Sequence, residues 1–337
     1  MKITLPTILM DAAIPYLADL IAPHCRLVTK AGSAITAEDA AEADALVVRT
    51  RTRCDEALLK GSRVRLIVTA TIGFDHIDRK WCAANNIRVV TAAGCNARGV
   101  LQWVSAVLVG YLRSTNRTPQ ATTLGIIGVG HVGGLVKQYA ESWGFRVICC
   151  DPPRQAREGL ADFRTAEEVA READILTLHT PLDSSTRHLV NDSLLQLMKP
   201  DALIINSSRG PVVDQTAILR ANHPYAFDVW EEEPKIAPEL LRRALYATPH
   251  IAGYTAQGKA NASAIAASEL AREFSLPFDG WYPPSVTPPA PRPIGWEEVQ
   301  NRIASYCNLQ AETETLRSHP ERFEQLRDEY AYREEFF

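Results

Sequence analysis

The sequence has few of the features that mark a membrane, secreted or nucleic-acid-binding protein. No apolar run approaches the roughly 18 residues that a membrane-spanning helix requires. The N-terminal apolar residues are soon interrupted by Asp11 and Pro15, which argues against a secretory signal. The 36 Lys and Arg residues are balanced by 40 Asp and Glu residues, so a net charge of −4 offers no basic surface for a nucleic acid. We therefore expect a cytoplasmic protein that binds neither a membrane nor a nucleic acid.

Cysteine is sparse and is not arranged for cross-linking or metal binding. The seven cysteines are odd in number and no two have Cys-x-x-Cys spacing, so neither a disulfide framework nor a metal site is expected. We expect reduced thiols, most of them buried. The chain is, however, long enough for more than one domain. Its 337 residues, 46% of them hydrophobic, suggest two globular domains and leave room for a small third.

Short apolar segments alternate with helical patterns through most of the chain. Four strands are expected in the first part, at residues 7–11, 26–29, 45–49 and 65–69. Five more are expected later, at residues 124–128, 146–151, 175–178, 202–206 and 225–229. Continuously apolar strands joined by helices are typical of parallel sheets that are covered on both faces. The sequence thus predicts an α/β fold with two Rossmann-like, doubly wound parallel-sheet domains.

The composition changes after residue 280. Six prolines fall between residues 281 and 295, which excludes a helix there and indicates an extended linker. Two helical patterns follow, at residues 296–307 and 320–330. About 40 residues rarely fold alone, and this segment has few apolar positions, so we expect a partner chain to cover them.

One glycine-rich motif indicates a dinucleotide site. The sequence Gly128-Val129-Gly130-His131-Val132-Gly133 follows an apolar strand and opens a helical pattern, and the next strand ends at Asp151. In such a motif the glycines allow a tight turn, close approach of the backbone to a pyrophosphate, and close packing of the helix on the strand. The carboxylate of Asp151 favours NAD over NADP, because it accepts hydrogen bonds from the ribose hydroxyls and repels a 2′-phosphate. Arg154, three residues further on, is a cation that would weaken this repulsion.

Several further motifs resemble those of the D-isomer-specific 2-hydroxyacid dehydrogenase family. They lie, in the family's order, at residues 69–78, 179–182, 204–210, 228–234 and 248–253. In this family the cofactor domain is inserted in the substrate domain. The resemblance implies a substrate-binding domain at residues 1–97 and 257–280, an NAD-binding Rossmann domain at 98–256, a proline-rich linker at 281–295 and a small C-terminal dimerisation domain at 296–337.

The resemblance also implies which residues carry the chemistry. His250 would be the base that takes the proton of the substrate hydroxyl, because an imidazole titrates near neutral pH. Glu233 would stabilise the imidazolium, and Arg209 would hold the substrate carboxylate through two parallel N–H bonds. The residues implied to contact NAD are Gly128, Gly130, His131, Val132, Gly133, Asp151, Thr180, Ser207, Ser208, Arg209, Asp228 and Gly253. Those implied to contact the substrate are Thr50, Thr71 and Tyr254.

Within the family, residues 149–154, 250–259 and 323–334 are most similar to a member that oxidises a phosphorylated four-carbon 2-hydroxy acid as a homodimer. Its phosphate needs cations away from Arg209. Arg49, Arg51 and Arg53 follow a predicted strand, where ligands bind in α/β sheets, and strand-like alternation would point all three one way. We expect Arg49 and Arg51 to contact the phosphate. Two other interpretations stay open: a dehydrogenase of phosphoglycerate, hydroxypyruvate or glyoxylate, and a non-enzymatic binding protein that senses NADH.

Overall fold

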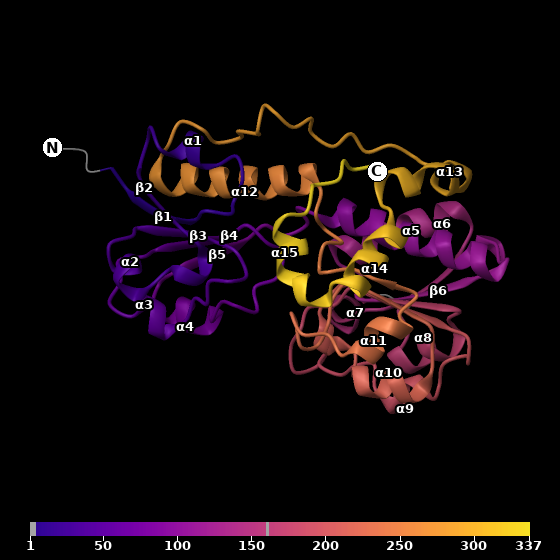
Figure 1. Ribbon diagram of the computed structural model, residues 1–337. Coiled ribbons are helices and arrows are strands. Elements are labelled where there is room, and N and C mark those ends of the chain that lie inside the picture. Colours follow the sequence, from indigo (N-terminus) through magenta and orange to yellow (C-terminus); the bar gives the residue numbers. More distant parts are fainter. Residues whose placement is uncertain (1–4, 160–161) are drawn as a thin grey trace. The chain divides into compact units, whose positions relative to one another are not determined.

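A computed structural model describes residues 5–159 and 162–337, which divide into two compact units (Figure 1). The first unit comprises residues 1–96 and 255–289, and the second comprises residues 97–254 and 290–337. Residues 1–4 of the predicted substrate domain and 160–161 of the predicted NAD-binding domain lie outside the described residues. Each unit is an α/β domain built on a parallel sheet, which confirms the predicted fold class. None of the described helices is long and apolar enough to cross a membrane.

The first unit is built on a five-stranded sheet with the order β2-β1-β3-β4-β5. Its strands are β1 (Thr7–Asp11), β2 (Arg26–Lys30), β3 (Ala45–Val48), β4 (Leu66–Thr69) and β5 (Arg88–Thr91). Every residue of β1, β3 and β4 is buried, whereas the edge strands β2 and β5 are partly exposed. This burial is typical of a parallel sheet with helices on both faces.

Alternate residues of these strands face opposite helical layers. Ile8 and Met10 pack with Leu270 of α12 (Ala256–Phe274), whereas Leu9 packs on the other face with Leu58. The shorter helices of the unit are α1 (Ala18–Ile21), η1 (Gly32–Ala34), α2 (Ala37–Ala41), α3 (Glu56–Leu59) and α4 (Arg79–Ala84). Successive side chains of a strand point to opposite faces of the sheet. Because helices cover both faces, apolar residues occupy both sets of positions.

The second unit is built on a six-stranded parallel sheet with the order β11-β10-β9-β8-β6-β7. Its strands are β6 (Thr123–Ile127), β7 (Arg146–Cys150), β8 (Ile175–Leu178), β9 (Leu203–Asn206), β10 (Tyr225–Phe227) and β11 (Tyr246–Ala247). Phe163 adds a single parallel bridge to Cys149 of β7. With that bridge counted as a strand, the chain follows the 3-2-1-4-5-6 order of a dinucleotide-binding sheet, and the order reverses between β6 and β8.

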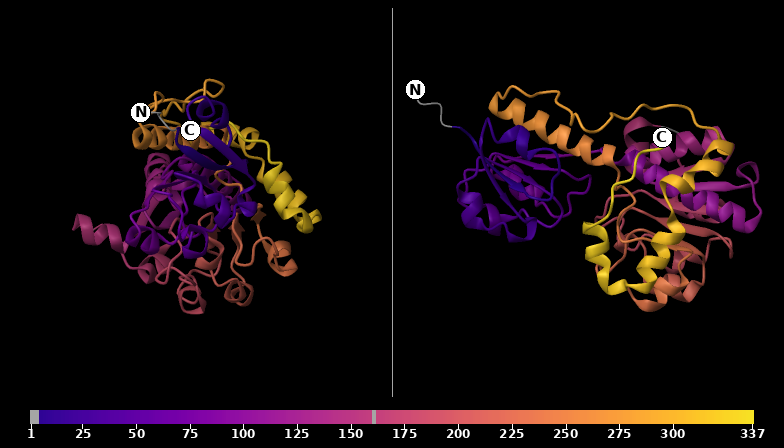
Figure 2. Two further views of the ribbon diagram at one scale, coloured as in Figure 1. Left: turned by 90° about the vertical axis from the view of Figure 1, so that its left-hand side faces the viewer. Right: turned by 45° about the horizontal axis from the view of Figure 1, so that its top comes forward.

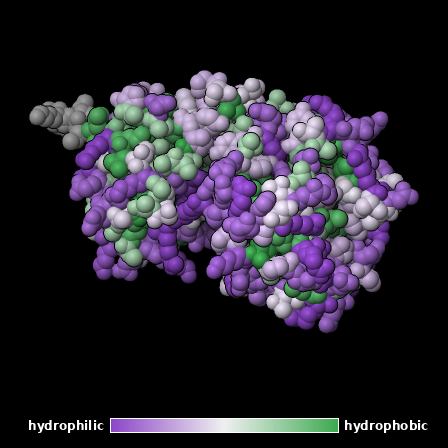
Figure 3. Space-filling view, in the orientation of Figure 1, coloured by the Kyte–Doolittle hydropathy of each residue, from purple (hydrophilic) through white to green (hydrophobic). Residues whose placement is uncertain are grey.

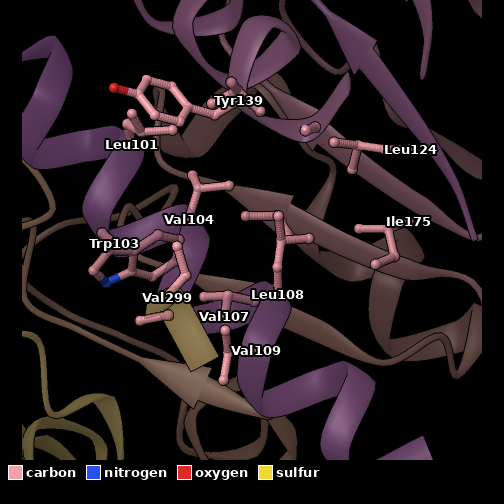
Figure 4. Close-up of a cluster of buried hydrophobic side chains, with 14 of the residues drawn as sticks. Leu101, Trp103, Val104, Val107, Leu108, Val109, Leu124, Tyr139, Ile175 and Val299 are labelled. Carbon is pink, nitrogen blue, oxygen red and sulfur yellow. The ribbon is translucent and has the colours of Figure 1, made fainter. Parts of the chain in front are cut away.

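Helices also cover both faces of the second sheet. They are α5 (Ala97–Thr115), η2 (Pro119–Ala121), α6 (His131–Trp143), α7 (Pro152–Glu158), α8 (Ala166–Glu172), α9 (Asp192–Leu195), η3 (Gly210–Val212), α10 (Gln215–Ala221) and α11 (Pro238–Arg243). Figure 4 shows the centre of one core cluster, where Val104 and Leu108 of α5 point toward Leu124 and Ile175 of the sheet, and Trp103 lies near Val299. The buried length of α5 explains its nearly continuous apolar sequence.

The C-terminal segment, residues 290–337, packs on the second unit. Its helices are α13 (Trp296–Tyr306), α14 (Leu309–Ser318), η4 (Pro320–Arg322) and α15 (Phe323–Asp328), the yellow elements of Figure 2. Val299 and Ile303 join the cluster around α5, and Leu316 and Phe323 join the cluster on the opposite face of the sheet. The expectation that a partner chain must cover these residues was wrong, because the sheet domain of the same chain supplies the apolar surface.

The surface is mostly hydrophilic on the face drawn in Figure 3. Among the described residues, Leu5, Phe74 and Tyr332 are the large apolar or aromatic side chains that stand exposed. All seven cysteines are free and buried, as the sequence predicts.

Candidate active site

The glycine-rich motif lies between β6 and α6. Gly128 has a φ of 87°, in the left-handed region, and a Cβ there would lie 2.7 Å from the backbone that follows β8. His131, Val132 and Gly133 form the first turn of α6, and a Cβ on Gly133 would lie 2.0 Å from the carbonyl oxygen of Gly128. Apart from Gly130 itself and its two chain neighbours, no described residue has an atom within 4 Å of the position that a Cβ on Gly130 would take. The loop therefore has an open side next to a helix N-terminus, where a pyrophosphate can bind.

Asp151 directly follows β7 and braces this loop. Its carboxylate accepts hydrogen bonds from the backbone N–H groups of Val129 (2.8 Å) and Arg154 (2.9 Å). A carboxylate has about four acceptor positions, so two remain for ribose hydroxyls. The Arg154 side chain donates to the carboxylate of Glu158 (2.7 Å) and to the carbonyl of Val129 (3.1 Å). Because its own helix already supplies a carboxylate, this guanidinium does not cancel the preference of Asp151 for NAD.

Two hydroxyl groups near the switch point of the sheet are buried without a partner. Thr180 follows β8 and Ser207 follows β9, and neither Oγ1 of Thr180 nor Oγ of Ser207 has a hydrogen-bond partner among the described residues. Buried polar atoms are nearly always hydrogen-bonded in native proteins, so these two indicate a polar ligand. Burial lowers the pKa of the neighbouring His179 to about 3, and its ring bonds the hydroxyl of Thr177 at 3.0 Å. The residues present thus fit NAD.

The Arg209 loop is shaped by the strand end that precedes it. Asn206, fully buried at the end of β9, accepts from the backbone N–H of Ser208 (3.0 Å) and donates to the carbonyl of Arg209 (2.9 Å). A Cβ on Gly210 would lie 1.9 Å from the carbonyl oxygen of Trp230. This close approach brings the Arg209 loop against the loop that carries Glu233, as the predicted chemistry requires.

Glu233 and His250 form a hydrogen-bonded pair, with 2.9 Å between Oε2 and Nδ1. The other carboxylate oxygen, Oε1, accepts from the backbone N–H of Trp230 at 2.8 Å and so fixes the orientation of the carboxyl group. Burial alone would raise the pKa of Glu233, but the charge and hydrogen bond of His250, the Trp230 N–H and the charge of Arg327 together hold it below its ordinary value. Glu233 is therefore an anion that can stabilise a charged imidazole.

Residues 248–254, here called the His250 loop, are anchored by Asp228 at the end of β10. The Asp228 carboxylate is buried and accepts from the hydroxyl of Thr248 (2.6 Å) and the backbone N–H groups of Ile251 (2.8 Å) and Ala252 (3.0 Å). Burial raises its pKa, against the opposing effects of the His250 charge and these hydrogen bonds. His250 has a φ of 59°, a left-handed conformation that costs energy in a residue with a Cβ, and the anchored neighbours maintain it. Asp228 is thus placed to shape the site rather than to stand open to a ligand.

The C-terminal segment also reaches the His250 loop, a feature that the sequence analysis missed. The Arg333 side chain donates to the carbonyl oxygens of Ile251 (3.0 Å) and Ala252 (2.7 Å). The backbone N–H of Arg333 donates to the carbonyl oxygen of Tyr254 (3.2 Å). Arg327 donates from Nε to the phenolic oxygen of Tyr254 at 3.1 Å. Gly253 lies between these contacts, within the same loop. No local sequence pattern separates these two arginines from the many charged residues around them.

Four of the predicted substrate residues belong to the first unit: Arg49, Thr50, Arg51 and Thr71. The chain turns immediately after β3, because the backbone N–H of Thr52 donates to the carbonyl of Arg49 at 3.2 Å. The expected strand-like alternation of the three arginines was therefore wrong. Arg53 pairs with Asp55 at 2.7 Å, so its charge is already partnered.

Thr71 lies two residues after β4, where its hydroxyl hydrogen-bonds the hydroxyl of Thr69 (2.6 Å) and the carbonyl of Gly73 (3.0 Å). Thr69 also bonds His76 at 3.2 Å. These bonds order the loop at the carboxyl end of β4, where ligands bind in open α/β sheets.

Comparison with known proteins points to one enzyme family. The sequence profile described as "D-isomer specific 2-hydroxyacid dehydrogenase, NAD binding domain" matches residues 97–252. The chain is 40% identical over 342 aligned residues to an erythronate-4-phosphate dehydrogenase of Bacteroides thetaiotaomicron, with 97% of each chain covered. It is 41% identical over 262 residues to that of Klebsiella pneumoniae, which covers 75% of this chain and 69% of the relative.

Solved structures agree on the fold. The NAD⁺-bound 3-phosphoglycerate dehydrogenase of Entamoeba histolytica superposes with a TM-score of 0.70 at 23% identity, covering 85% of this chain and 100% of that one. A D-lactate dehydrogenase of Aquifex aeolicus with NAD and lactic acid gives a TM-score of 0.64 at 22% identity, covering 84% and 100%.

Proposed function

Because the chain belongs to the D-isomer-specific 2-hydroxyacid dehydrogenase family, we propose that it oxidises 4-phospho-D-erythronate to 3-hydroxy-2-oxo-4-phosphooxybutanoate. Family membership makes it an NAD-dependent oxidoreductase that acts on a CH–OH group. The substrate is the proposal, and it rests on the 40% identity to an erythronate-4-phosphate dehydrogenase over nearly the whole of both chains. The corresponding place in metabolism is the synthesis of pyridoxal 5′-phosphate, the active form of vitamin B6.

The observation that carries the activity is the hydrogen bond between Glu233 and His250. Since Nδ1 of His250 faces the carboxylate, Nε2 is the atom that takes the proton of the substrate hydroxyl. Glu233 then stabilises the imidazolium, with its own orientation set by the Trp230 N–H. Arg209 grips the substrate carboxylate through a bidentate pair of N–H bonds. NAD, when bound, supplies the acceptor for the hydride that leaves the same carbon.

The phosphate of the substrate calls for cations at a second position. Arg49, Thr50 and Arg51 lie in the turn after β3. Thr71 follows β4, the strand that pairs with β3. A phosphate carries about 1.5–2 negative charges at neutral pH, which arginine binds well. We therefore expect kcat/KM for 4-phosphoerythronate to exceed that for erythronate by at least about 100-fold, or about 2.7 kcal/mol of transition-state stabilisation.

A substrate panel with spectroscopic detection of NADH tests the proposal. The panel contains 4-phosphoerythronate, erythronate, 3-phosphoglycerate and glycerate, and the first should be oxidised most efficiently. Arg51→Gln should shrink the preference for the phosphorylated acid, whereas Arg53→Gln, a matched change at the arginine already paired with Asp55, should leave it unchanged. Preference for 3-phosphoglycerate would make the protein a different dehydrogenase, and NADH binding without turnover of any acid would make it a sensor.

Two further parts of the proposal concern assembly and location. We propose a homodimer that involves residues 296–337, on the resemblance of residues 323–334 to the dimerisation segment of family members. The exposed Tyr332 lies in this segment, and Tyr332→Glu should shift the dimer to monomer in sedimentation analysis. We also propose a cytoplasmic location, which seven free, buried cysteines support because thiols persist in a reducing compartment.

A further inference from the structure

Helices α14 and α15 are fixed to the sheet domain by both polar and apolar contacts. Thr313 accepts a hydrogen bond from the backbone N–H of Ala247 in β11 at 3.0 Å. Arg317 donates to the carbonyl oxygens of Leu241 (3.1 Å) and Ala244, at the end of α11. Phe323, the first residue of α15, is 1% exposed within the core cluster of the sheet. The position of α15 is thus determined by the fold of this unit.

This anchoring places Arg327, near the end of α15, against Tyr254 of the His250 loop. Its Nε lies 3.1 Å from the phenolic oxygen of Tyr254, to which it donates. Its positive charge also acts on Glu233, the partner of His250. A phenol that accepts from a guanidinium keeps its own O–H as a donor, and the bond that it accepts strengthens that donor.

We propose that Arg327 is a positioning residue of the dehydrogenase site, which holds the phenol of Tyr254 for the substrate and keeps a cation beside the Glu233 carboxylate. The proposal rests on the proposed function, in which Tyr254 contacts the substrate. It makes the C-terminal segment part of the catalytic machinery. Arg327 acts through Tyr254 and Glu233. Its removal should therefore change the affinity for the substrate and the pH dependence of kcat/KM without weakening the binding of NADH.

Several charged groups surround the pair and define the electrostatic argument. Asp228 lies beneath the His250 loop, and Arg333 faces Asp228 from the C-terminal segment. The positive charge of Arg327 on α15 helps to lower the pKa of Glu233. On the Glu233 loop itself, Glu231 is paired with His188. Because the charges of Asp228 and Arg333 oppose each other, the loss of Arg327 leaves Glu233 with less cationic support, and its carboxylate takes up a proton at higher pH.

A double-mutant cycle on the full-length protein tests the contact. Arg327→Met and Tyr254→Phe should each raise KM for 4-phosphoerythronate by about 10-fold, while the dissociation constant of NADH stays within about 2-fold. The double variant should resemble either single variant, because each change removes the same hydrogen bond. Multiplied effects in the double variant, or an unchanged KM in Arg327→Met, would overturn the proposal.

Two further variants separate charge, hydrogen bond and fold. Arg327→Lys keeps the charge but lacks the planar Nε donor, so KM should rise while the acid limb of the kcat/KM profile stays in place. In Arg327→Met that limb should move to higher pH. Arg322→Met is the matched control, because Arg322 lies on the same segment and its side chain donates to the side-chain amide oxygen of Gln325. Neither KM nor the acid limb should change.

One readout is independent of turnover. The Nδ1–H proton of His250 in its bond to Glu233 gives a downfield NMR resonance, assigned by its loss in His250→Gln. As pH is lowered and Glu233 takes up a proton, this resonance should disappear at a higher pH in Arg327→Met than in the unmodified protein. If 4-phosphoerythronate is not oxidised, the proposed function fails while this measurement still decides the role of Arg327; an unshifted disappearance would refute that role even in an active enzyme.

Discussion

Asp228 and Arg333 hold the same stretch of backbone from opposite sides. The Asp228 carboxylate accepts from the N–H groups of Ile251 and Ala252, and the Arg333 guanidinium donates to the carbonyl oxygens of the same two residues. An anion on the N–H side and a cation on the C=O side leave both peptide groups of Ile251 and Ala252 hydrogen-bonded. The left-handed conformation of His250 is maintained by this arrangement rather than by the residue's own preference.

Arg333→Met should destabilise the protein strongly. It removes a donor from the carbonyl groups of Ile251 and Ala252 and a cation from a buried cluster, a change that typically costs about 3–5 kcal/mol. Chemical denaturation measures the loss. Arg302→Met, which removes an exposed arginine from α13, should cost less than about 1 kcal/mol. A small loss in both variants would mean that the loop is held by Asp228 alone.

His250→Ala should lower kcat by about 10²–10⁴-fold, the usual contribution of a general base, while NADH affinity is retained. The reason is that the imidazole acts on the substrate hydroxyl and has no role in the cofactor site. Steady-state kinetics and NADH fluorescence titration check the two parts. His319→Ala, at an exposed histidine in the C-terminal segment, is the control and should leave both quantities unchanged. Near-normal turnover in His250→Ala would require another base.

Asp151→Asn should weaken NAD binding and reduce discrimination against NADP. The amide keeps one acceptor oxygen for the Val129 N–H, but it loses the charge that repels a 2′-phosphate. The ratio of kcat/KM for the two cofactors is the measurement. Asp183→Asn changes an exposed carboxylate in the turn after β8 and serves as the charge-matched control. Equal use of NAD and NADP by the unmodified protein would contradict the role of Asp151.

The pH dependence of stability should carry the signature of Glu233. Its pKa in the folded protein is lowered, so the stabilisation from its ionised form is complete above the unfolded value and is lost as pH falls through the folded value. Glu233→Gln should therefore flatten the decline in unfolding free energy between about pH 5 and pH 3. Denaturant titrations at each pH test this. Glu321→Gln, at an exposed carboxylate, should keep the slope of the unmodified protein.

The buried strands could be predicted because they are apolar on both faces. The strands at 7–11 and 175–178 match the expected residues. Strand β5 was not predicted, because it begins with the charged Arg88 and lies at a sheet edge. Helix α14 was missed for a similar reason, since only Leu309, Thr313 and Leu316 are buried in ten residues. The three positions have helical spacing, but one of them is a threonine, so the apolar pattern is too weak to predict the helix.

The candidate site shows the same limit at the level of side chains. The glycine motif could be predicted because its residues are adjacent in sequence and each has a local steric reason. The Glu233–His250 pair came from the family resemblance, which also pointed to Arg333 as a charge supplied by a partner chain, but the contacts of Arg327 and Arg333 with the His250 loop of their own chain were not predicted. They meet the His250 loop across more than 70 residues of chain, and nothing in their immediate sequence distinguishes Arg327 from Arg322.

The discontinuity of the first unit has a consequence for its synthesis. When residues 5–96 leave the ribosome, the sheet face that includes Ile8, Met10 and Val47 is covered only in part, by residues in and around α1, because α12 begins roughly 160 residues later. At about 5–20 residues per second, that interval lasts about 10–30 s. An apolar sheet face exposed for so long is a substrate for chaperones and a route to aggregation. All strands of the NAD-binding sheet are therefore synthesised before α12 can complete the cover of the first sheet.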